Sequence, residues 1–499
     1  MKINRSDFLS VIILLLLTIL TWRHLPTIPF QGEGFYYFEK LTTNFKFHFP
    51  LPQDVFARLL FNFITPIFMG HLDKYMYLLF VVMLVIDLAL YVFIRVTTGN
   101  KLAAFLTAFL FSVSYVGNYD MYSSGGYQYF AQRASILLPL LASLMFFLLY
   151  FLRNFQFKYY LISITVYLFG VAMGFFGTWF LPPFIFYPYF YLLFNLGELK
   201  KKMHKVIWVP LPFLVGNYLL ISDSLGHYNQ ESFLSYLIHN PNLLPNLIQQ
   251  LVVISLPPGI YELPIKFLHL AKKTEEVPLL GLLTFIVYGL ALIYIWKLKR
   301  ASIVLAATAI LSIVLMSLFN LYLNSANVLF TFGSSRYFYY PSVFVAVFWG
   351  LFLTSLQSPK KGSNLFLVTF CVMWFAINNI AIQRNLADDE WRNRANTDTI
   401  NYLRLWSKDL KQNPSYVFLP ANLGGYGATF AFRYFSHPDG IFRLQGFNDL
   451  DLPALAKAKI DPNTLYVLTL SIKDEQVFDK TDESRRALSD LEKKIDEKN

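Results

Sequence analysis

The chain has 499 residues, of which 56% are hydrophobic, 18% aromatic and only 15% charged. A soluble domain carries about 25% charged residues, so this composition excludes an ordinary soluble protein and favours a chain that crosses a membrane many times. The net charge of +11 does not indicate a nucleic-acid partner. Residues 383–499 hold 17 Lys and Arg against 18 Asp and Glu, and much of the basic surplus before them lies in short loops between apolar runs.

Eleven apolar runs predict transmembrane helices, because each is near the 17–25 residues that cross about 30 Å of hydrocarbon. They cover residues 8–22, 74–95, 102–118, 134–152, 159–176, 178–196, 206–222, 278–296, 301–323, 337–357 and 364–382. No small-residue cleavage site follows the first run, which we therefore interpret as an uncleaved span. The predicted fold class is an all-α polytopic membrane domain of about 11 transmembrane helices, residues 1–382, followed by a smaller domain.

Basic residues gather on alternate loops between these runs, and this asymmetry predicts the topology. The six clusters are Lys2/Arg5, Arg95/Lys101, Arg153/Lys158, Lys200–Lys205, Lys297–Arg300 and Lys360/Lys361. We predict that these segments and the amino terminus are cytoplasmic. An odd number of spans then places the carboxy terminus on the extracytoplasmic side of a plasma or inner membrane.

A further apolar stretch, residues 243–262, would change this topology if it crossed the bilayer. It contains two glutamines and an internal Pro-Pro-Gly, so we predict an interfacial or re-entrant helix on the outer side.

Polar residues dominate residues 383–499, which predict a small extracytoplasmic α/β or α+β domain. An amphipathic stretch at 400–410 predicts a helix, and the runs SYVFLP and TLYVLTLS predict strands separated by turn signals. The charged sequence ESRRALSDLEKKIDEKN at its end predicts a solvated helix or a frayed tail.

The long first outer loop, residues 23–73, carries an acidic residue in the sequence QGEGFYYFEK. Glu33 lies between two glycines, so its backbone can approach a ligand closely, and Tyr36 and Tyr37 offer aromatic surface beside it. The structural alternative is an ordinary loop turn with an aromatic belt at the edge of the bilayer.

Two later outer loops carry arginines. The sequence GNYDMYSSGGYQYFAQR has Asp120 near its start and Arg133 at the head of the fourth span, and Arg336 occurs in GSSRYFYYPS. Arginine pairs with phosphate through two hydrogen bonds, which suits a phosphate-bearing ligand. The alternatives are that Asp120 caps a helix and that the arginines contact ordinary lipid headgroups.

In the order and common side of these loops, the chain resembles the GT-C integral membrane glycosyltransferases, particularly bacterial relatives of the protein O-mannosyltransferases. The resemblance covers about residues 1–382. It implies a polyprenyl-phosphate-linked sugar donor and a glycan, lipid or protein acceptor. It also implies catalytic roles for Glu33 and Asp120, and donor-phosphate binding by Arg133, Arg336 and Tyr337.

The resemblance and the residues leave several alternatives open. Glu39 could be the base instead of Glu33, since many members of the family have paired acids in the first loop, and Asp120 could bind a divalent metal, orient the acceptor or organise its loop. The competing functions are an O-antigen-type polysaccharide polymerase or ligase, a lipid-linked-sugar transporter or flippase, and an inactive scaffold. Asp87, the one acid found in the middle of a span, is interpreted as a buried polar contact rather than a transport site.

Overall fold

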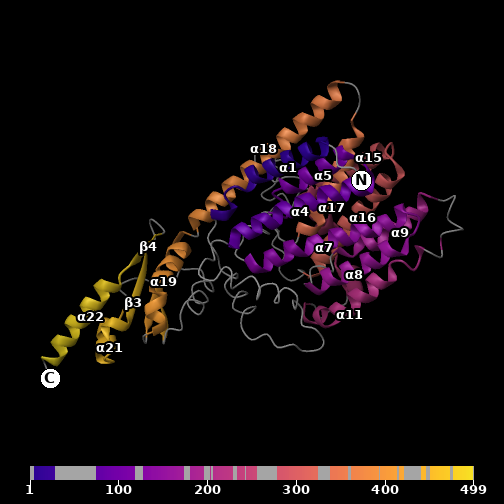
Figure 1. The fold of residues 1–499 in the computed structure, drawn as a ribbon. Helices are drawn as coiled ribbons and strands as arrows, with labels where there is room; N and C mark the ends of the chain where they lie inside the picture. Colours follow the sequence, from indigo (N-terminus) through magenta and orange to yellow (C-terminus); the bar gives the residue numbers. More distant parts are fainter. Residues whose placement is uncertain are drawn as a thin grey trace.

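The computed structural model describes residues 5–27, 75–118, 127–173, 180–195, 203, 206–228, 233–241, 243–255, 278–323, 338–357, 361–392, 394–412, 415–420, 440–444, 450–471 and 476–497. These residues form a bundle of apolar helices and a small domain with a β-sheet (Figure 1). The helices of the bundle are α1 (Arg5–Trp22), α4 (Tyr75–Thr98), α5 (Lys101–Ser112), α7 (Tyr127–Leu152), α8 (Phe157–Met173), α9 (Pro182–Leu193), α11 (Leu211–Tyr228), α12 (Phe233–His239), α13 (Leu243–Ser255), α15 (Pro278–Ile295), α16 (Arg300–Leu323), α17 (Tyr339–Ser355) and α18 (Lys361–Arg392), with a short 3-10 turn, η1 (Leu25–Thr27), after α1.

Each of the eleven predicted spans overlaps one of these helices. Within the described residues, four helices are long and apolar enough to cross a bilayer, namely Arg5–Trp22, Phe80–Thr98, Arg300–Tyr322 and Asn364–Ala387. Other apolar helices are shorter, such as Lys101–Ser112. The apolar helices identify a membrane protein, whereas the predicted count of about eleven spans is not confirmed.

Helix α17 runs through the centre of the bundle. Its side chains from Tyr339 to Phe348 are all buried, and it packs against α5 and α16. It approaches α5 closely at Gly350, where a Cβ atom would lie 2.8 Å from the backbone nitrogen of Thr107. This absence of a side chain lets the two backbones come together, as is common where membrane helices cross.

Aromatic rings join four other helices. Phe147 of α7 lies edge-on to Phe184 of α9 and Phe213 of α11, with ring centroids 5.0 and 5.3 Å apart. Tyr167 of α8 contacts Phe184 at 4.8 Å. Edge-to-face pairs contribute about 0.5–1.5 kcal/mol each beyond the area that they bury, so this cluster fixes α7, α8, α9 and α11 to one another.

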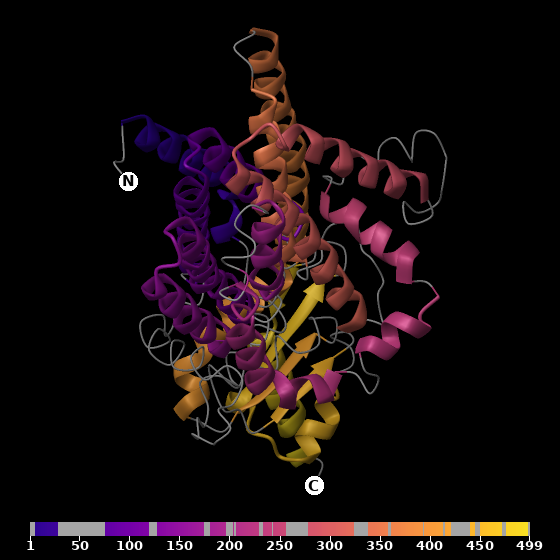
Figure 2. The ribbon, with the colours of Figure 1, turned by 90° about the vertical axis from the view of Figure 1, so that its right-hand side faces the viewer.

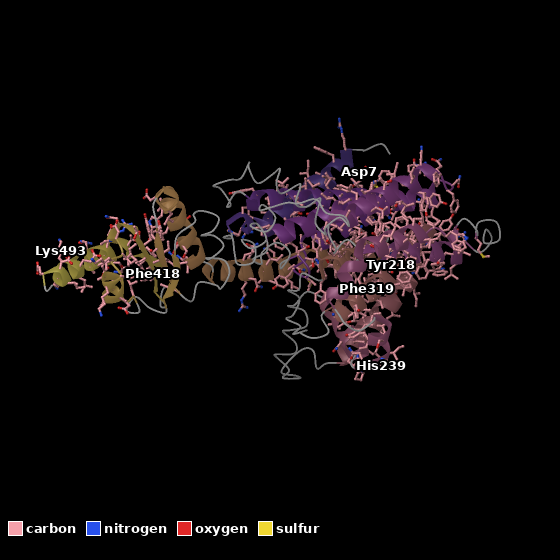
Figure 3. The ribbon with its side chains drawn as sticks, turned by 90° about the horizontal axis from the view of Figure 1, so that it is seen from below. Asp7, Tyr218, His239, Phe319, Phe418 and Lys493 are labelled. Carbon is pink, nitrogen blue, oxygen red and sulfur yellow. The ribbon has the colours of Figure 1, made fainter. Side chains whose placement is uncertain are left out.

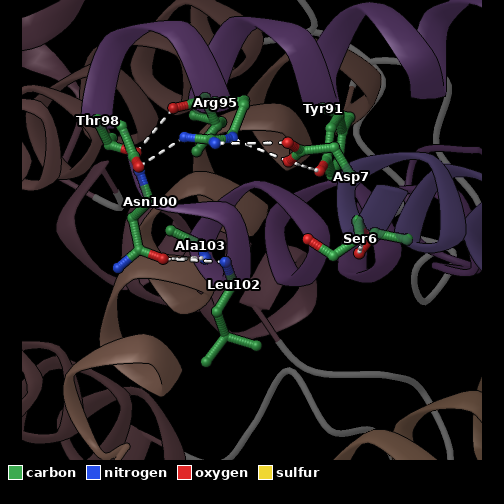
Figure 4. Close-up of polar contacts among 11 residues, drawn as sticks. Ser6, Asp7, Tyr91, Arg95, Thr98, Asn100, Leu102 and Ala103 are labelled. Carbon is green, nitrogen blue, oxygen red and sulfur yellow. Dashed lines mark hydrogen bonds and ion pairs between the residues drawn. The ribbon is translucent and has the colours of Figure 1, made fainter. Parts of the chain in front are cut away.

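A buried ion pair ties the amino-terminal end of α1 to the carboxy-terminal end of α4 (Figure 4). Arg95 Nε donates to Asp7 Oδ1 at 3.0 Å, and Tyr91 Oη donates to the same oxygen at 2.9 Å. The side chain of Asn100 then caps α5 by accepting from two backbone N–H groups of its first turn. Helices α1 and α4 therefore run in opposite directions. We call the end of the bundle that carries Asp7, Arg95 and Asn100 the basic end.

Asp87 lies inside α4 and is fully buried. Thr18 of α1 places its Oγ1 atom 2.9 Å from Asp87 Oδ2 and 3.0 Å from the carbonyl oxygen of Leu14. This contact between neighbouring helices supports the interpretation of Asp87 as a buried structural group.

Helix α13 occupies the first part of the ambiguous stretch 243–262. It has 13 residues, which extend about 20 Å, and it packs against α15, α16 and α17. Its last residue, Ser255, is hydrogen-bonded to Tyr288 Oη at 2.8 Å. This packing inside the bundle favours the re-entrant alternative over a helix on the membrane surface; residues 256–262 lie outside the described residues.

The carboxy-terminal domain is a four-stranded sheet with helices on both faces (Figure 1). The strands are β1 (Tyr416–Pro420), β2 (Gly440–Leu444), β3 (Leu465–Ser471) and β4 (Gln476–Asp479), in the order β2-β1-β3-β4. The helices are α19 (Arg394–Gln412), α21 (Leu452–Lys457) and α22 (Thr481–Asp496), with a 3-10 turn, η8 (Pro462–Thr464). β1 pairs in parallel with β2 and β3, and β4 is antiparallel. This mixed sheet matches the predicted α/β alternative, and the predicted helices and both predicted strands are confirmed.

This domain lies beyond the end of the bundle opposite to the basic end (Figures 1 and 3). Helix α18 passes through the predicted boundary at 382 and ends at Arg392, and α19 begins two residues later. Trp406, near the end of α19, packs on Tyr466, near the start of β3, with ring centroids 5.1 Å apart. The chain leaves the bundle along α18 (Figure 1), and α19 packs on the sheet. The parallel strands run back toward the bundle (Figure 2).

Candidate functional site

The residues predicted to form the site fall almost entirely beyond what the structure describes. Glu33, Glu39, Asp120, Arg336 and Tyr337 lie outside the described residues. Arg133 lies near the start of α7, where the backbone is described and the side chain is not. The structure describes the segments from which the three outer loops depart.

The first loop departs from a point fixed by a tryptophan. Trp22, the last residue of α1, is fully buried, and its Nε1 donates to the carbonyl oxygen of Ser112 at 2.8 Å. Ser112 is the last residue of α5. Glu33 follows the last described residue of this segment, Thr27, by six residues. The start of the first loop is thus joined to the helix that leads into the second.

The second loop departs from a compact turn after α5. Tyr115 N–H donates to Asn378 Oδ1 of α18 at 2.8 Å, and Asn118 Nδ2 donates back to the carbonyl oxygen of Phe111 at 2.6 Å. Gly117 between them has φ +78°, a conformation that glycine adopts readily. These contacts hold the chain up to two residues before Asp120.

The last of the three loops rejoins the bundle at the same turn. A Cβ atom on Gly117 would lie 2.9 Å from the carbonyl carbon of Phe338, so the two backbones are in direct contact. Tyr339 packs its ring against Phe111 of α5, with centroids 5.6 Å apart. Arg336 and Tyr337 immediately precede Phe338 in the sequence, so their loop ends where the second loop begins.

Two polar residues of α18 complete this end of the bundle. The Asn378 side chain accepts from the turn after α5, and five residues later Gln383 Nε2 donates to the carbonyl oxygen of Thr21 at 2.5 Å. Sequence analysis missed both residues as parts of the site. The signal was the polar pair Asn378-Asn379 within the last predicted span, with Gln383 directly after it, since buried polar side chains in membrane helices face protein partners.

We call the end of the bundle formed by Trp22, Ser112, Gly117, Phe338 and Gln383 the loop end. It faces the carboxy-terminal domain and lies opposite to the basic end (Figure 1). In the ranges that the structure describes, no three His, Cys, Asp or Glu residues are grouped so that they could hold a metal ion. The candidate carboxylates Glu33 and Asp120 lie outside those ranges.

The fold agrees with the resemblance to the GT-C membrane glycosyltransferases that the outer loops suggested. The chain is similar to the archaeal oligosaccharyltransferase AglB from Archaeoglobus fulgidus, solved in complex with an inhibitory peptide and a dolichol-phosphate. The TM-score is 0.50 at 13% identity, over 93% of this chain and 69% of the other. The apo form of the oligosaccharyltransferase of the same organism gives 0.50 at 12% identity over the same shares. At these identities the likeness is one of fold. The sequence matches no known family and no curated protein.

Proposed function

We propose that the protein is a membrane glycosyltransferase that moves a sugar from a polyprenyl-phosphate-linked donor to an acceptor on the outer face of the membrane. The observation that carries this proposal is the contact between Gly117 and Phe338, together with the bond from Trp22 to Ser112. These contacts gather the departure points of the three loops that carry Glu33, Asp120 and Arg336. A donor phosphate and an acceptor hydroxyl must meet catalytic groups at one place, and the loop end supplies that place.

Each residue then has a distinct task in a single displacement. Glu33 removes the proton from the acceptor hydroxyl, whose oxygen bonds to the anomeric carbon as the bond from that carbon to the phosphate oxygen breaks. The leaving polyprenyl phosphate gains negative charge, which Arg133 and Arg336 stabilise through paired hydrogen bonds, with Tyr337 as a further donor. Attack opposite the leaving group inverts the anomeric configuration, as in inverting glycosidases.

Asp120 has three candidate roles, which are to orient the acceptor, to bind a divalent cation or to organise its loop. Carboxylate oxygens are suitable ligands for Mg²⁺ or Mn²⁺, and no step above passes through a metal. Transfer assayed with and without EDTA, for the wild type and for Asp120→Asn, tests the cation role. If Asp120 binds a cation, EDTA should abolish wild-type transfer, added Mg²⁺ or Mn²⁺ should restore it, and Asp120→Asn should need a higher concentration of the cation.

The experiment that tests the proposal measures binding of polyprenyl phosphate, the expected leaving group, to the purified protein, with polyprenol as the control that lacks the phosphate. We expect phosphate-dependent binding, weakened about tenfold or more by Arg133→Gln or Arg336→Gln, since hydrogen bonds to charged groups contribute about 1.5–3 kcal/mol. Arg486→Gln, which removes an exposed arginine on α22 of the carboxy-terminal domain, is the matched control. Equal binding of polyprenol and polyprenyl phosphate would overturn the donor site.

The competing functions differ in their products. A polymerase or ligase extends or attaches a lipid-linked glycan, so its product carries more than one transferred sugar unit. A flippase moves the lipid-linked sugar between leaflets and leaves the sugar–phosphate bond intact. Analysis of the lipid and the acceptor after incubation with membranes that contain radiolabelled lipid-linked sugars distinguishes the three.

A further inference from the structure

A small cavity lies between α13, α15 and α16, which pack against one another at one side of the bundle (Figure 2). Its volume is about 30 Å³, and six side chains line it: Leu251 of α13, Thr284 and Tyr288 of α15, and Ile310, Ile313 and Val314 of α16. The surface that these side chains present to the cavity is apolar. The Tyr288 hydroxyl is hydrogen-bonded to Ser255 at 2.8 Å, so this polar group already has a partner.

The chemistry of this wall determines what the cavity can hold. An enclosed water molecule needs about two to four polar partners, and the described side chains that line the cavity offer an apolar surface instead. A single water needs roughly 10–15 Å³ of such volume, so this cavity has room for one or two methyl-sized groups. Apolar cavities of proteins stay dry and take apolar ligands. The cavity therefore suits a short apolar branch.

Ring contacts with α17 give the depth of the cavity in the bundle. Tyr288 lies against Trp349, with ring centroids 5.3 Å apart, and Tyr294 lies against Phe352 at 6.2 Å. Helix α15 therefore runs in the same direction as α17, which begins with Tyr339 at the loop end. Trp349 is ten residues after Tyr339, a helical distance of about 15 Å. The cavity thus lies about 15 Å from the loop end, inside the apolar part of the bundle.

The cavity also lies beside the side of the bundle that faces lipid. Val287 and Leu311 directly neighbour the lining residues Tyr288 and Ile310 in sequence, and they are 44% and 36% exposed. Successive side chains of a helix point about 100° apart, so the wall of the cavity and the exposed apolar face adjoin on both α15 and α16. A lipid chain that lies on this face can place a branch in the cavity while the helices stay where they are.

We propose that this cavity, which we call the isoprenoid recess, holds a methyl branch of the donor's polyprenyl chain. A polyprenyl chain carries one methyl group on every unit, whereas an unbranched acyl chain has none to fill the recess. With its phosphate at the loop end, the chain reaches the recess within its first few units. Between groups that are already in lipid, association depends on van der Waals packing rather than on removal from water, so a fitted recess can select a branched chain. The inference rests on the proposed function and extends it to the lipid part of the donor.

The test compares decaprenyl phosphate with hexadecyl phosphate, which has the same headgroup on an unbranched chain. Native mass spectrometry of the full-length protein, released from detergent micelles that contain equal amounts of the two, should show mainly decaprenyl phosphate adducts. Val314→Leu adds one carbon to the wall and fills part of the recess. It should weaken decaprenyl phosphate binding about threefold or more, because the methyl branch loses its van der Waals contacts, and should leave hexadecyl phosphate binding unchanged. Its Tm should not fall, since filling a cavity commonly stabilises a protein.

The matched control is Val287→Leu, the same substitution at a lipid-facing position of α15, which should leave binding of both phosphates unchanged. Equal binding of the two phosphates by the wild type would overturn the isoprenoid recess, with or without a folded Val314→Leu protein, and would leave the donor-phosphate site intact. Equal effects of the two substitutions would also overturn the recess.

Two further outcomes separate the recess from its alternatives. If an excess of phosphatidylcholine lowers wild-type binding of decaprenyl phosphate to the level of Val314→Leu, ordinary acyl chains occupy the recess and the inference is wrong. If the wild type binds decaprenol as well as it binds decaprenyl phosphate, the proposed donor site is overturned and the recess falls with it.

Discussion

Gly117 and Phe338 are separated by more than 200 residues, yet their backbones touch at the loop end of the bundle. Gly117 lies in the last described turn before the second loop, and Phe338 is the first described residue after the loop that carries Arg336. The contact requires a residue without a side chain at position 117, for reasons of both space and conformation.

Replacement of Gly117 by alanine should destabilise the protein more than the same replacement at Gly99. Both glycines have positive φ, +78° and +70°, so each alanine costs about 1–2 kcal/mol of conformational strain. A Cβ atom at Gly117 would also meet Phe338, whereas none of the atoms surrounding Gly99 lies within 4 Å of such a Cβ. Thermal unfolding in detergent should show the larger fall in Tm for Gly117→Ala; equal falls would contradict the contact.

The crossing of α5 and α17 gives a second matched pair of glycines. Gly350→Ala should lower the free energy of unfolding by about 1–3 kcal/mol, because the added methyl group would overlap the backbone of Thr107. Gly289 lies in α15 with open space around its Cβ position, so Gly289→Ala should leave Tm unchanged or raise it slightly. A stable Gly350→Ala protein would show that the two helices are farther apart than described.

The hydrogen bond between Thr18 and Asp87 allows a test of the structural role of the intramembrane acid. Asp87→Asn keeps the shape and the capacity to bond Thr18, so transfer and Tm should stay close to the wild type. Thr18→Val should lower stability by about 1 kcal/mol, the usual size of a side-chain hydrogen bond between membrane helices. If Asp87→Asn abolished function at unchanged Tm, the carboxylate would instead have a chemical role and the transporter alternative would gain weight.

The sequence predicts which residues form helices and strands better than it predicts which of these elements contact one another. Apolar runs locate the helices because each run must cover a hydrocarbon length, and short strand-like runs between turn signals locate β1 and β3. Strand β2, the sequence GIFRL, escapes prediction because it is short, begins with glycine and carries an arginine. The predicted eleven spans correspond to helices, but several of these helices are shorter than a full crossing.

The candidate site shows the same limit more sharply. Tyr115 and Asn378 are 263 residues apart and meet through a backbone N–H, a group that every residue other than proline possesses. Trp22 likewise donates to a backbone carbonyl oxygen, and no sequence pattern predicts which carbonyl accepts such a bond. The sequence therefore allowed catalytic and phosphate-binding roles to be proposed for Glu33, Asp120 and the arginines. Only the structure showed that the three loops start and end close to one another.

The predicted topology can be tested with a single cysteine. In a Cys371→Ser background, Asn499→Cys places the one thiol at the carboxy terminus. A membrane-impermeant maleimide should label it in intact cells or spheroplasts, because an odd number of spans places this end outside. A cysteine at Lys299, in the turn between α15 and α16, should be labelled only after the membrane is permeabilised. The reverse pattern would invert the topology and move the proposed donor site to the cytoplasmic face.

The choice between the two acids of the first loop is the most direct test of the proposed chemistry. Glu33→Gln should reduce transfer about 10²–10⁴-fold, the usual effect of removing a general base, because the amide cannot accept the acceptor's proton. Glu39→Gln, six residues later in the same loop, changes charge equally and should have a much smaller effect. Radiolabelled sugar transferred per minute measures both variants against the wild type.

Measuring polyprenyl phosphate binding by the variants distinguishes loss of the catalytic base from loss of the folded site. Glu33→Gln should bind it at least as well as the wild type, since removal of a nearby negative charge does not weaken phosphate binding. A variant that loses transfer and binding together has lost the site rather than the base. If Glu39→Gln lost transfer with binding intact while Glu33→Gln kept full turnover, Glu39 would be the base, and the donor-binding roles of Arg133 and Arg336 would stand unchanged.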